Sequence, residues 1–470
     1  MRDFFSVAMR HRAAALWAAM LCIALAGSAL AFGLGFIGGA PVKAALSKDN
    51  IHMGVASCGG TTCHGRQEAD GKTVRQDEIL RWQEPSSPTG AHSRAYAVLS
   101  EPRGREIATR LGIGAATSAG ECLGCHADAP PVGKRGAQFR LSDGVGCEAC
   151  HGGASEWLAS HRAVGGTHAA NVAKGMVPLD RPMVKASVCL DCHFGSADGG
   201  QFVSHRIMAA GHPRISFELD LFSTLQQHHN EDADYAARKG RTNNVRVWAV
   251  GQAMALDRAL SLYANAQYGT EGAFPEFYFY DCHSCHRRIE DTENFKATAL
   301  SNPGRPVAPG TPPFNDENMI MLSAAARVAA PALAARFDAD SKAFHRANTE
   351  SRAAAVAAGA KLRATAQALA AAFGSASFDR AKTMAIIDTI SSEAIAPRFT
   401  DYTGSTQSVM AVDTLLNAMV NAGQVPPGSA QAIRGDINRA YAAVKDPNDY
   451  RPLDFRRALG SAVRTIRTLR

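Results

Sequence analysis

The chain has 470 residues and a formal net charge of +7, from 50 Lys and Arg residues against 43 Asp and Glu residues. Ten of its eleven cysteines belong to five short motifs, so no pair is left for a structural disulfide. The positive charge does not predict nucleic-acid binding, because each cofactor that the motifs predict would add two carboxylates and offset that charge.

The N-terminal segment has the pattern of a membrane signal. Three arginines within residues 1–12 precede an uncharged run over residues 13–40, which is longer than the apolar core of an ordinary signal peptide. We expect a cytoplasmic basic N-terminus over the first range and a signal anchor, a transmembrane helix, over the second. The remainder would then lie on the periplasmic side of the cytoplasmic membrane. Cleavage after residue 31 or near residue 45 is the alternative, and it would leave a soluble periplasmic protein.

Five motifs between residues 50 and 290 have the spacing of covalent haem attachment. Two thiols on one short turn reach the two vinyl groups of a porphyrin edge, and the histidine that follows becomes the proximal iron ligand. Neither a zinc ribbon nor a disulfide framework requires a histidine after every cysteine pair. Four motifs fit C-x-x-C-H, the first has four residues between its cysteines, and together they predict a multihaem c-type cytochrome with five covalently bound haem c. The motif residues are Cys58, Cys63 and His64; Cys122, Cys125 and His126; Cys147, Cys150 and His151; Cys189, Cys192 and His193; and Cys282, Cys285 and His286.

Residues 50–290 are expected to form a pentahaem cytochrome domain. Gly, Pro and Asp interrupt this region repeatedly, and bound porphyrins would supply most of its hydrophobic filling. We expect a mainly α fold here, loop-rich and wrapped around the haems, with short helices and nearly no strands. One longer helix is predicted over residues 244–268, where apolar residues recur at helical spacing, and we expect it to pack beside the haems.

A proline-rich linker is expected over residues 301–313, followed by a helical C-terminal domain, a helical bundle, over residues 315–470. The second region is rich in alanine, repeats apolar residues at three and four, and contains no haem motif. Pro331 is expected to kink or split its first helix. A scaffold, docking or homo-oligomerisation role is favoured over chemistry. The predicted helices span residues 317–337, 341–373, 377–394, 408–421, 429–444 and 453–469.

Ten further histidines lie in or after the motif region, apart from the motif histidines themselves. Five irons need at most five distal ligands, so every iron can be six-coordinate with two histidines, which suits electron transfer. His52, His168, His283 and His345 are expected to be ordinary side chains that bind no iron.

Three segments resemble the cytochrome c554-like multihaem family. They are residues 91–95, residues 144–153 followed by Trp157 and His161, and residues 205–214. The usual members of that family carry four haems with C-x-x-C-H throughout, whereas this chain has five motifs and a longer first one. The resemblance implies distal haem ligands, and for the fifth of them two neighbouring residues stay open. These histidines are His92, His161, His205, His212 and either His228 or His229.

The spacing of His205 and His212 supports their assignment independently. On a helix, residues seven apart would share one face about 10.5 Å apart along the axis, far enough to address two different haems. Pro213 disfavours a helical conformation of the residue before it, so the helix is expected to end near His212. Arg206 and Arg214 beside this pair are candidates for tuning haem potentials.

Two functions are compatible with these residues. The favoured one is a membrane-tethered periplasmic pentahaem cytochrome that passes single electrons between respiratory donors and a periplasmic acceptor, with periplasmic or membrane-bound redox proteins as partners. The alternative is an oxidoreductase that acts on a small nitrogen or sulfur species, such as nitrite, hydroxylamine or tetrathionate, at one haem without a distal histidine. No catalytic residue is assigned, and an electron carrier is favoured over an enzyme because the histidines are in surplus.

Overall fold

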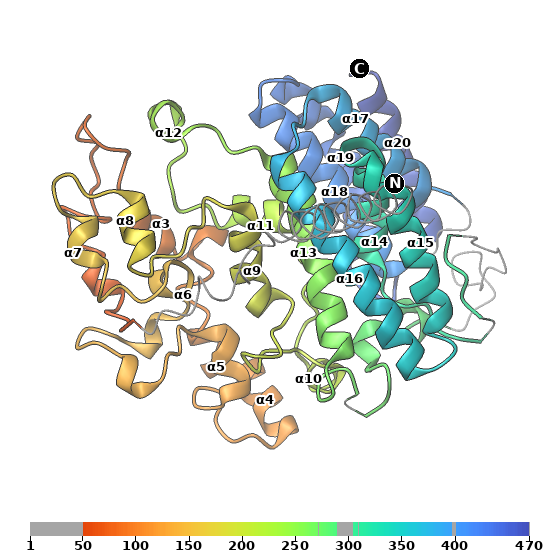
Figure 1. Ribbon diagram of the computed structural model, residues 1–470, viewed down its shortest axis with the longest axis horizontal. Coiled ribbons are helices and arrows are strands. Elements are labelled where there is room, and N and C mark those ends of the chain that lie inside the picture. Colours follow the sequence, from red (N-terminus) through yellow and green to blue (C-terminus); the bar gives the residue numbers. More distant parts are fainter. Residues whose placement is uncertain (1–49, 271, 289–303, 309, 397–400, 470) are drawn as a thin grey trace, which may run out of the picture. The chain divides into compact units, whose positions relative to one another are not determined.

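The computed structural model describes residues 50–270, 272–288, 304–308, 310–396 and 401–469. These residues form a mainly α-helical structure that contains no β-strand and three isolated β-bridges (Figure 1). The predictions of a mainly α fold and of nearly absent strands are confirmed for this part of the chain. The predicted cytoplasmic segment, residues 1–12, and the predicted signal anchor, residues 13–40, lie outside the described residues. No helix within the described ranges is both long and apolar enough to span a membrane.

Short helices and turns carry most of the motif region. Residues that start and stop helices keep these elements short, as α4 shows. It begins with Pro102, whose missing N–H would be unpaired at a helix start in any case, and it ends before Gly112, whose φ is 69°. The α-helices before residue 244 are α3 (Glu78–Trp82), α4 (Pro102–Leu111), α5 (Gly120–His126), α6 (Cys147–His151), α7 (Leu158–His161), α8 (His168–Ala173), α9 (Pro182–His193), α10 (His205–Ala209), α11 (Leu219–Leu225) and α12 (Ala233–Lys239). The 3-10 helices are η1 (Val55–Ser57), η2 (Pro88–Gly90), η3 (Ala97–Ser100), η4 (Val132–Lys134), η5 (Leu141–Asp143), η6 (Phe277–Phe279) and η7 (Cys282–Ser284).

The first part of the motif region has little apolar core of its own. Its buried apolar side chains gather in two small clusters, one around Leu99 and Ala108 and the other around Ala154 and Trp157. A protein domain usually has one contiguous core with smaller satellite clusters. The small clusters are consistent with the expectation that bound porphyrins supply the filling here.

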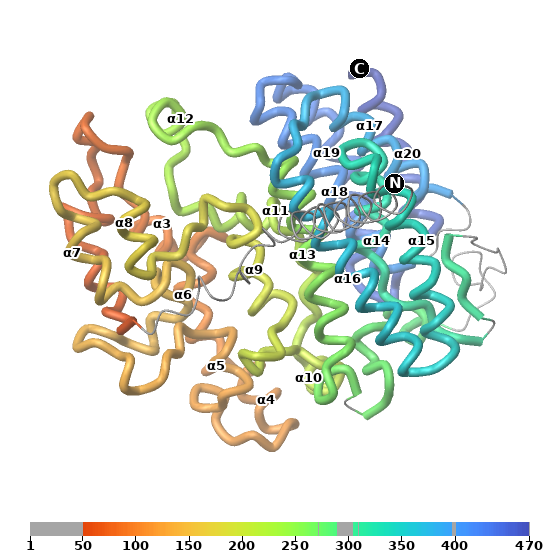
Figure 2. The backbone as a smooth tube through the Cα atoms, in the orientation of Figure 1, coloured from red at the N-terminus to blue at the C-terminus, as the bar shows by residue number. Residues whose placement is uncertain are grey.

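Long helices make up the rest of the chain, shown from green to blue in Figure 2. They are α13 (Asn244–Ala264), α14 (Glu317–Ala329), α15 (Pro331–Ala347), α16 (Arg352–Ser375), α17 (Arg380–Ala394), α18 (Tyr402–Asn421), α19 (Pro427–Ala443) and α20 (Pro452–Arg467). Buried side chains from all of these helices belong to one large hydrophobic cluster. The helices α14 to α20 lie within residues 315–470, where the alanine-rich sequence predicts a helical bundle, and α13 joins them from the preceding region.

Two helix boundaries in this bundle test the helix ends that the sequence predicts. Pro331 splits the first predicted helix, because α14 ends two residues before it and α15 starts with it. The helix predicted over residues 341–373 is wrong at its start, since α15 continues to Ala347 and a new helix begins after Ser351. The Oγ of Ser351 accepts the backbone N–H of Ala354 at 3.1 Å, and this N-cap favours a helix start at that point.

Helix α13 packs mainly against other helices and only partly at the predicted haem sites. Its side chains Trp248 and Leu260 share the large cluster with Leu362 of α16 and Leu415 of α18. The helix contacts α16 most extensively, and it also contacts α9, which carries the fourth motif (Figure 2). The expectation that α13 packs beside the haems therefore holds only through α9. A helix that is apolar on nearly all sides is buried by neighbours on several sides.

Arg258 joins α13 to the end of α9 that carries the fourth motif. Its guanidinium donates to the carbonyl oxygens of Gly195 at 2.6 Å and Ser187 at 3.3 Å, and it also pairs with Asp191. One guanidinium thus contacts the middle of α9 and the turn that follows its last residue, His193. The motif region and the bundle thus share polar contacts as well as a core.

The predicted linker is packed against the helices. Its described residues, 304–308 and 310–313, contain no helix or strand, as its prolines predict. The guanidinium of Arg305 is nearly buried and forms ion pairs with Asp316 and Asp401, which stand just before α14 and α18. Burial alone would raise the pKa of Asp316, but the charge of Arg305 overrides it and lowers that pKa to about 2.

Candidate haem centres

The attachment motifs lie on short turns that bring their cysteines to one side. The second motif ends α5, the third forms the whole of α6, the fourth ends α9, and the fifth begins with η7. Residues three apart lie on one face of a helix, so both thiols of a C-x-x-C pair point the same way. None of the ten motif cysteines is paired in a disulfide, so every sulfur is available for a thioether bond to a vinyl group.

Each motif histidine faces a second histidine, and we number the resulting sites 1 to 5 by the chain order of their motifs. The distances between ring centroids all fall within 6.0 to 6.4 Å. The pairs are His64 with His161 at 6.0 Å (site 1), His126 with His212 at 6.2 Å (site 2), His151 with His228 and with His229 at 6.4 Å (site 3), His193 with His92 at 6.1 Å (site 4), and His286 with His205 at 6.0 Å (site 5).

This separation fits two imidazoles bound to one metal ion. A metal–nitrogen bond of about 2.0 Å and a ring radius of about 1.1 Å, counted on both sides, give roughly 6 Å between centroids. The rings of His64 and His161 are parallel within 10° at 6.0 Å. Parallel rings in direct contact would be about 3.5–4.0 Å apart, so this pair leaves room for an ion and its two bonds. The residues present therefore fit five haems with two axial histidines each.

The segment from His205 to His212 reaches two sites by a different route from the predicted helix. Helix α10 covers only its first residues and ends at Ala209, so the expected shared helix face is wrong. Gly211 has a φ of 117°, which a helix does not allow, and it turns the chain before Pro213. His205 then faces the histidine of site 5, and His212 faces that of site 2.

Site 3 has two candidate distal histidines. The ligand atoms of His151, His228 and His229 all lie within 4.8 Å of one another. The rings of His228 and His229 are 4.3 Å apart, and both are 6.4 Å from the ring of His151. The ring distances therefore do not decide between His228 and His229 as the distal ligand, which the sequence also leaves open.

Hydrogen bonds to Nδ1 leave Nε2 free for a metal at several of these rings. Nδ1 of His64 lies 3.0 Å from the carboxylate of Glu78, and Nδ1 of His126 lies 2.8 Å from the carbonyl oxygen of Ala95. Such partners fix the tautomer and orientation of a metal-binding histidine. By contrast, Nδ1 of His193 is buried without a partner, and its ring stacks on Phe217 at 4.7 Å.

Burial keeps the motif histidines of sites 3 and 4 neutral. Burial, with the help of neighbouring histidines, lowers the pKa of His151 to about 4, and burial likewise lowers the pKa of His193 to about 4. Neutral imidazole is the form that binds a metal.

Contacts between the motifs place the sites in a continuous series. Cys58 lies beside Cys147, which brings sites 1 and 3 together, and Cys125 lies beside Cys192, which does the same for sites 2 and 4. The Sγ of Cys192 is also 3.6 Å from the carbonyl oxygen of Gly124 in the second motif. Site 3 adjoins site 4, because Cys150 lies near Cys189 of the fourth motif. Helices α5 and α9, which carry sites 2 and 4, are also in contact (Figure 1).

Arg214 connects site 5 to its surroundings. The residue lies two positions after His212 of site 2, and its Nη1 donates to the Sγ of Cys282 at 2.9 Å. It also stands 5.3 Å over the ring of Tyr278 and pairs with Glu317 at 3.5 Å. The other predicted tuner, Arg206, pairs with Glu121 at the surface. Of the two arginines, the one that contacts an attachment cysteine is therefore Arg214.

The four histidines expected to bind no iron have other partners. Nδ1 of His52 lies 2.8 Å from Asp128, and His168 lies 3.2 Å from Asp180. His283 lies 3.0 Å from the carbonyl oxygen of Pro447, and His345 lies 3.3 Å from the carboxylate of Asp316.

Two acidic residues contribute to the sites through contacts that the sequence analysis did not predict. Glu78 contacts two histidines, as described below. Glu148 lies inside the third motif, and its carboxylate accepts the backbone N–H groups of Met53 at 2.8 Å, Gly54 at 2.7 Å and Ala154 at 2.8 Å. This residue therefore fixes the chain that leads into the first motif.

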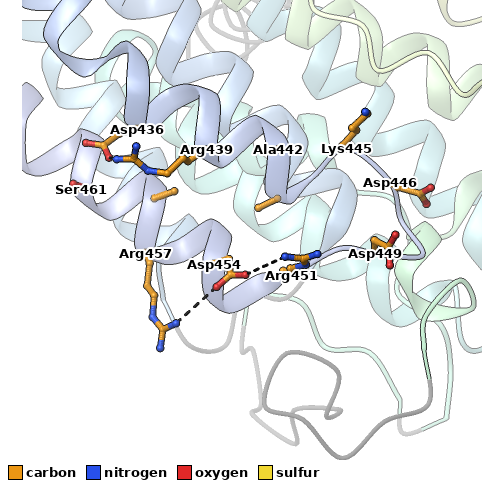
Figure 3. Close-up of a pocket in the computed structure, with 12 residues that line it drawn as sticks. Asp436, Arg439, Ala442, Lys445, Asp446, Asp449, Arg451, Asp454, Arg457 and Ser461 are labelled. Atoms are coloured by element: carbon orange, nitrogen blue, oxygen red, sulfur yellow. Dashed lines mark hydrogen bonds and ion pairs between the residues drawn. The ribbon is translucent and has the colours of Figure 1, made fainter.

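A hollow of about 730 Å³ lies in the bundle, and none of the residues that line it is a motif cysteine or histidine (Figure 3). Its lining is strongly charged: Arg451 and Arg457 both reach Asp454, at 3.9 Å and 3.7 Å. Opposite charges that pair with one another at an exposed surface need no ligand. We assign no chemistry to this hollow.

Free cysteine pairs on helical turns, each followed by a histidine that faces another histidine, define a multihaem c-type cytochrome with covalently bound haem c. Residues 58–152, which contain the first three motifs, match the model of the family described as cytochrome c554 and c-prime. This match supports a cytochrome c554-like multihaem family for that part of the chain, and with it electron transfer by a c-type cytochrome. No curated protein and no solved structure gives a significant match to the chain.

Proposed function

We propose that the protein is a membrane-tethered pentahaem cytochrome that passes single electrons between respiratory donors and a periplasmic acceptor. The observation that carries this proposal is that all five motif histidines face a second histidine at 6.0 to 6.4 Å. Haem c supplies one-electron chemistry when it is bound. Two axial histidines on every iron would leave no coordination position for a substrate.

The chain would hold the haems through three sets of residues. The ten motif cysteines would form the thioether bonds and the motif histidines the proximal bonds. The distal ligands would be His161, His212, His92 and His205 for sites 1, 2, 4 and 5, and His228 or His229 for site 3. The contacts between neighbouring motifs support a series that runs through sites 1, 3, 4 and 2, with site 5 next to site 2.

The location and partners in this proposal rest on the sequence. The arginines before residue 13 and the uncharged run over residues 13–40 support a retained anchor with the haem region on the periplasmic side. Redox proteins of the periplasm or the membrane are the partners that this location offers. The bundle would serve as a scaffold, a docking surface or a contact between copies of the chain.

Electron paramagnetic resonance of the fully oxidised holoprotein, with spins counted against haem content, tests the proposal. Five haems per chain and low-spin signals alone are expected, because two histidines on each iron give low-spin centres. A high-spin signal equal to one haem per chain would contradict an all-histidine series. Nitrite, hydroxylamine and tetrathionate would then be tested as substrates of the open haem.

A further inference from the structure

One buried carboxylate serves histidines of two different sites. Glu78 is the first residue of α3 and only 7 % exposed. Its Oε2 lies 3.0 Å from Nδ1 of His64, the motif histidine of site 1. Its Oε1 lies 3.2 Å from Nδ1 of His229, which faces the motif histidine of site 3. The two oxygens of one side chain thus each contact a different candidate haem site.

The two carboxylate oxygens of Glu78 fix the tautomer of both rings, because each lies within hydrogen-bond distance of an Nδ1 atom. A carboxylate can only accept hydrogen bonds, so Nδ1 of each ring must carry the proton. The Nε2 lone pair of both His64 and His229 is then free to bind a metal.

The neighbouring histidine is oriented differently. Nδ1 of His228 has two neighbours in its own turn, the side-chain Nε2 of Gln226 at 2.9 Å and the backbone carbonyl oxygen of Gln226 at 3.4 Å. Both are neutral groups, whereas the partner of Nδ1 of His229 is a carboxylate oxygen. A carboxylate is the partner that commonly orients a metal-binding histidine, and it distinguishes two rings that the centroid distances leave equivalent.

We propose that Glu78 is a positioning residue shared by sites 1 and 3, which orients His64 and makes His229 the distal ligand of site 3. This inference rests on the proposed pentahaem function. A carboxylate hydrogen-bonded to an axial histidine makes that ligand more basic and favours oxidised iron. Glu78 thus lowers the reduction potentials of two adjacent haems, while site 4, whose His193 has no Nδ1 partner, receives no such contribution.

The first test is a spectroscopic redox titration of the E78Q holoprotein. Glutamine keeps the shape but has a single acceptor oxygen and no charge, so the midpoint potentials of two of the five haems are expected to shift upward. The matched control is E84Q, two residues beyond the end of α3, because the carboxylate of Glu84 accepts the hydroxyl of Ser86 instead of bonding a histidine. Unchanged potentials in E78Q, or a shift of one haem alone, would overturn the shared role.

The second test compares H229A with H228A by electron paramagnetic resonance. H229A is expected to keep five attached haems and to convert one to high spin, whereas H228A is expected to keep five low-spin haems. A new high-spin haem in H228A, or none in H229A, would refute the assignment. Failure of this inference can be told apart from failure of the proposed function. If the proposed function is wrong, the unsubstituted protein itself will lack five low-spin haems.

Discussion

At the scale of single residues, the hydrogen-bond partner of each histidine determines what its ring can do. Histidine has two ring nitrogens, and the one left without a proton binds the metal. Nδ1 of His212 lies 2.8 Å from the carbonyl oxygen of Pro213, so its Nε2 is free on the side of His126. His168 instead pairs with Asp180 at an exposed position.

Replacement of His212 by alanine tests this assignment. All five haems are expected to stay attached, since no cysteine is touched, and the haem of site 2 is expected to become high spin because its iron loses one axial nitrogen. Spin counting by electron paramagnetic resonance measures the change as one haem in five. H168A serves as the control, with no expected change, and an unaltered H212A spectrum would remove His212 from the distal ligands.

At the scale of elements, buried carboxylates join helices of the motif region to the bundle. Glu218 caps α11 by accepting the backbone N–H groups of Asp220 at 2.8 Å and Leu221 at 2.7 Å. It also accepts the hydroxyl of Thr414 in α18 at 3.1 Å. Burial raises the pKa of this carboxyl to about 7. Folding therefore takes up a proton at this residue in neutral solution.

This shift predicts how stability depends on pH. Between about pH 4.5 and pH 7 the folded protein keeps a proton on Glu218 that the unfolded chain has lost, so stability should fall as pH rises through this window. The contribution of one such group is at most about 3 kcal/mol. Denaturant unfolding at pH 5 and pH 8 measures the difference, and E218Q is expected to reduce it. The exposed control E106Q should leave it unchanged, and an equal pH dependence in E218Q and the unsubstituted protein would contradict the account.

The same scale shows what the sequence can and cannot predict. Pro331 acts through its own backbone, so the break between α14 and α15 is readable from one residue. The positions of the cysteines and the adjacent histidines also follow from the spacing of the motifs alone. In contrast, the histidine that faces each motif histidine lies between 77 and 101 residues away along the chain, so no local spacing relates the two. Glu78 is equally invisible, because its role depends on two contacts made only in the folded chain.

At the scale of the whole described unit, one core joins the motif region to the bundle. The cluster that contains Leu190 of α9 and Trp248 of α13 continues without a break to Leu362 of α16 and Phe455 of α20. Elements that share a single core unfold together, since neither can lose its packing without exposing the other. The proline-rich segment over residues 301–313 therefore does not divide this core into two.

A destabilising substitution in the core of the bundle should consequently also lower the stability of the haem sites. Leu362 is fully buried, and L362A is expected to lower the free energy of unfolding by about 2–5 kcal/mol because it leaves a cavity. Far-UV circular dichroism reports the helices and the haem Soret band reports the sites, and both transitions should move together. K361A, at the exposed neighbouring position, should change stability by no more than about 0.5 kcal/mol. Two separate transitions, with only the helical one displaced by L362A, would show that the bundle and the haem region are independent. One displaced transition would mean that the core of the bundle stabilises the haem sites.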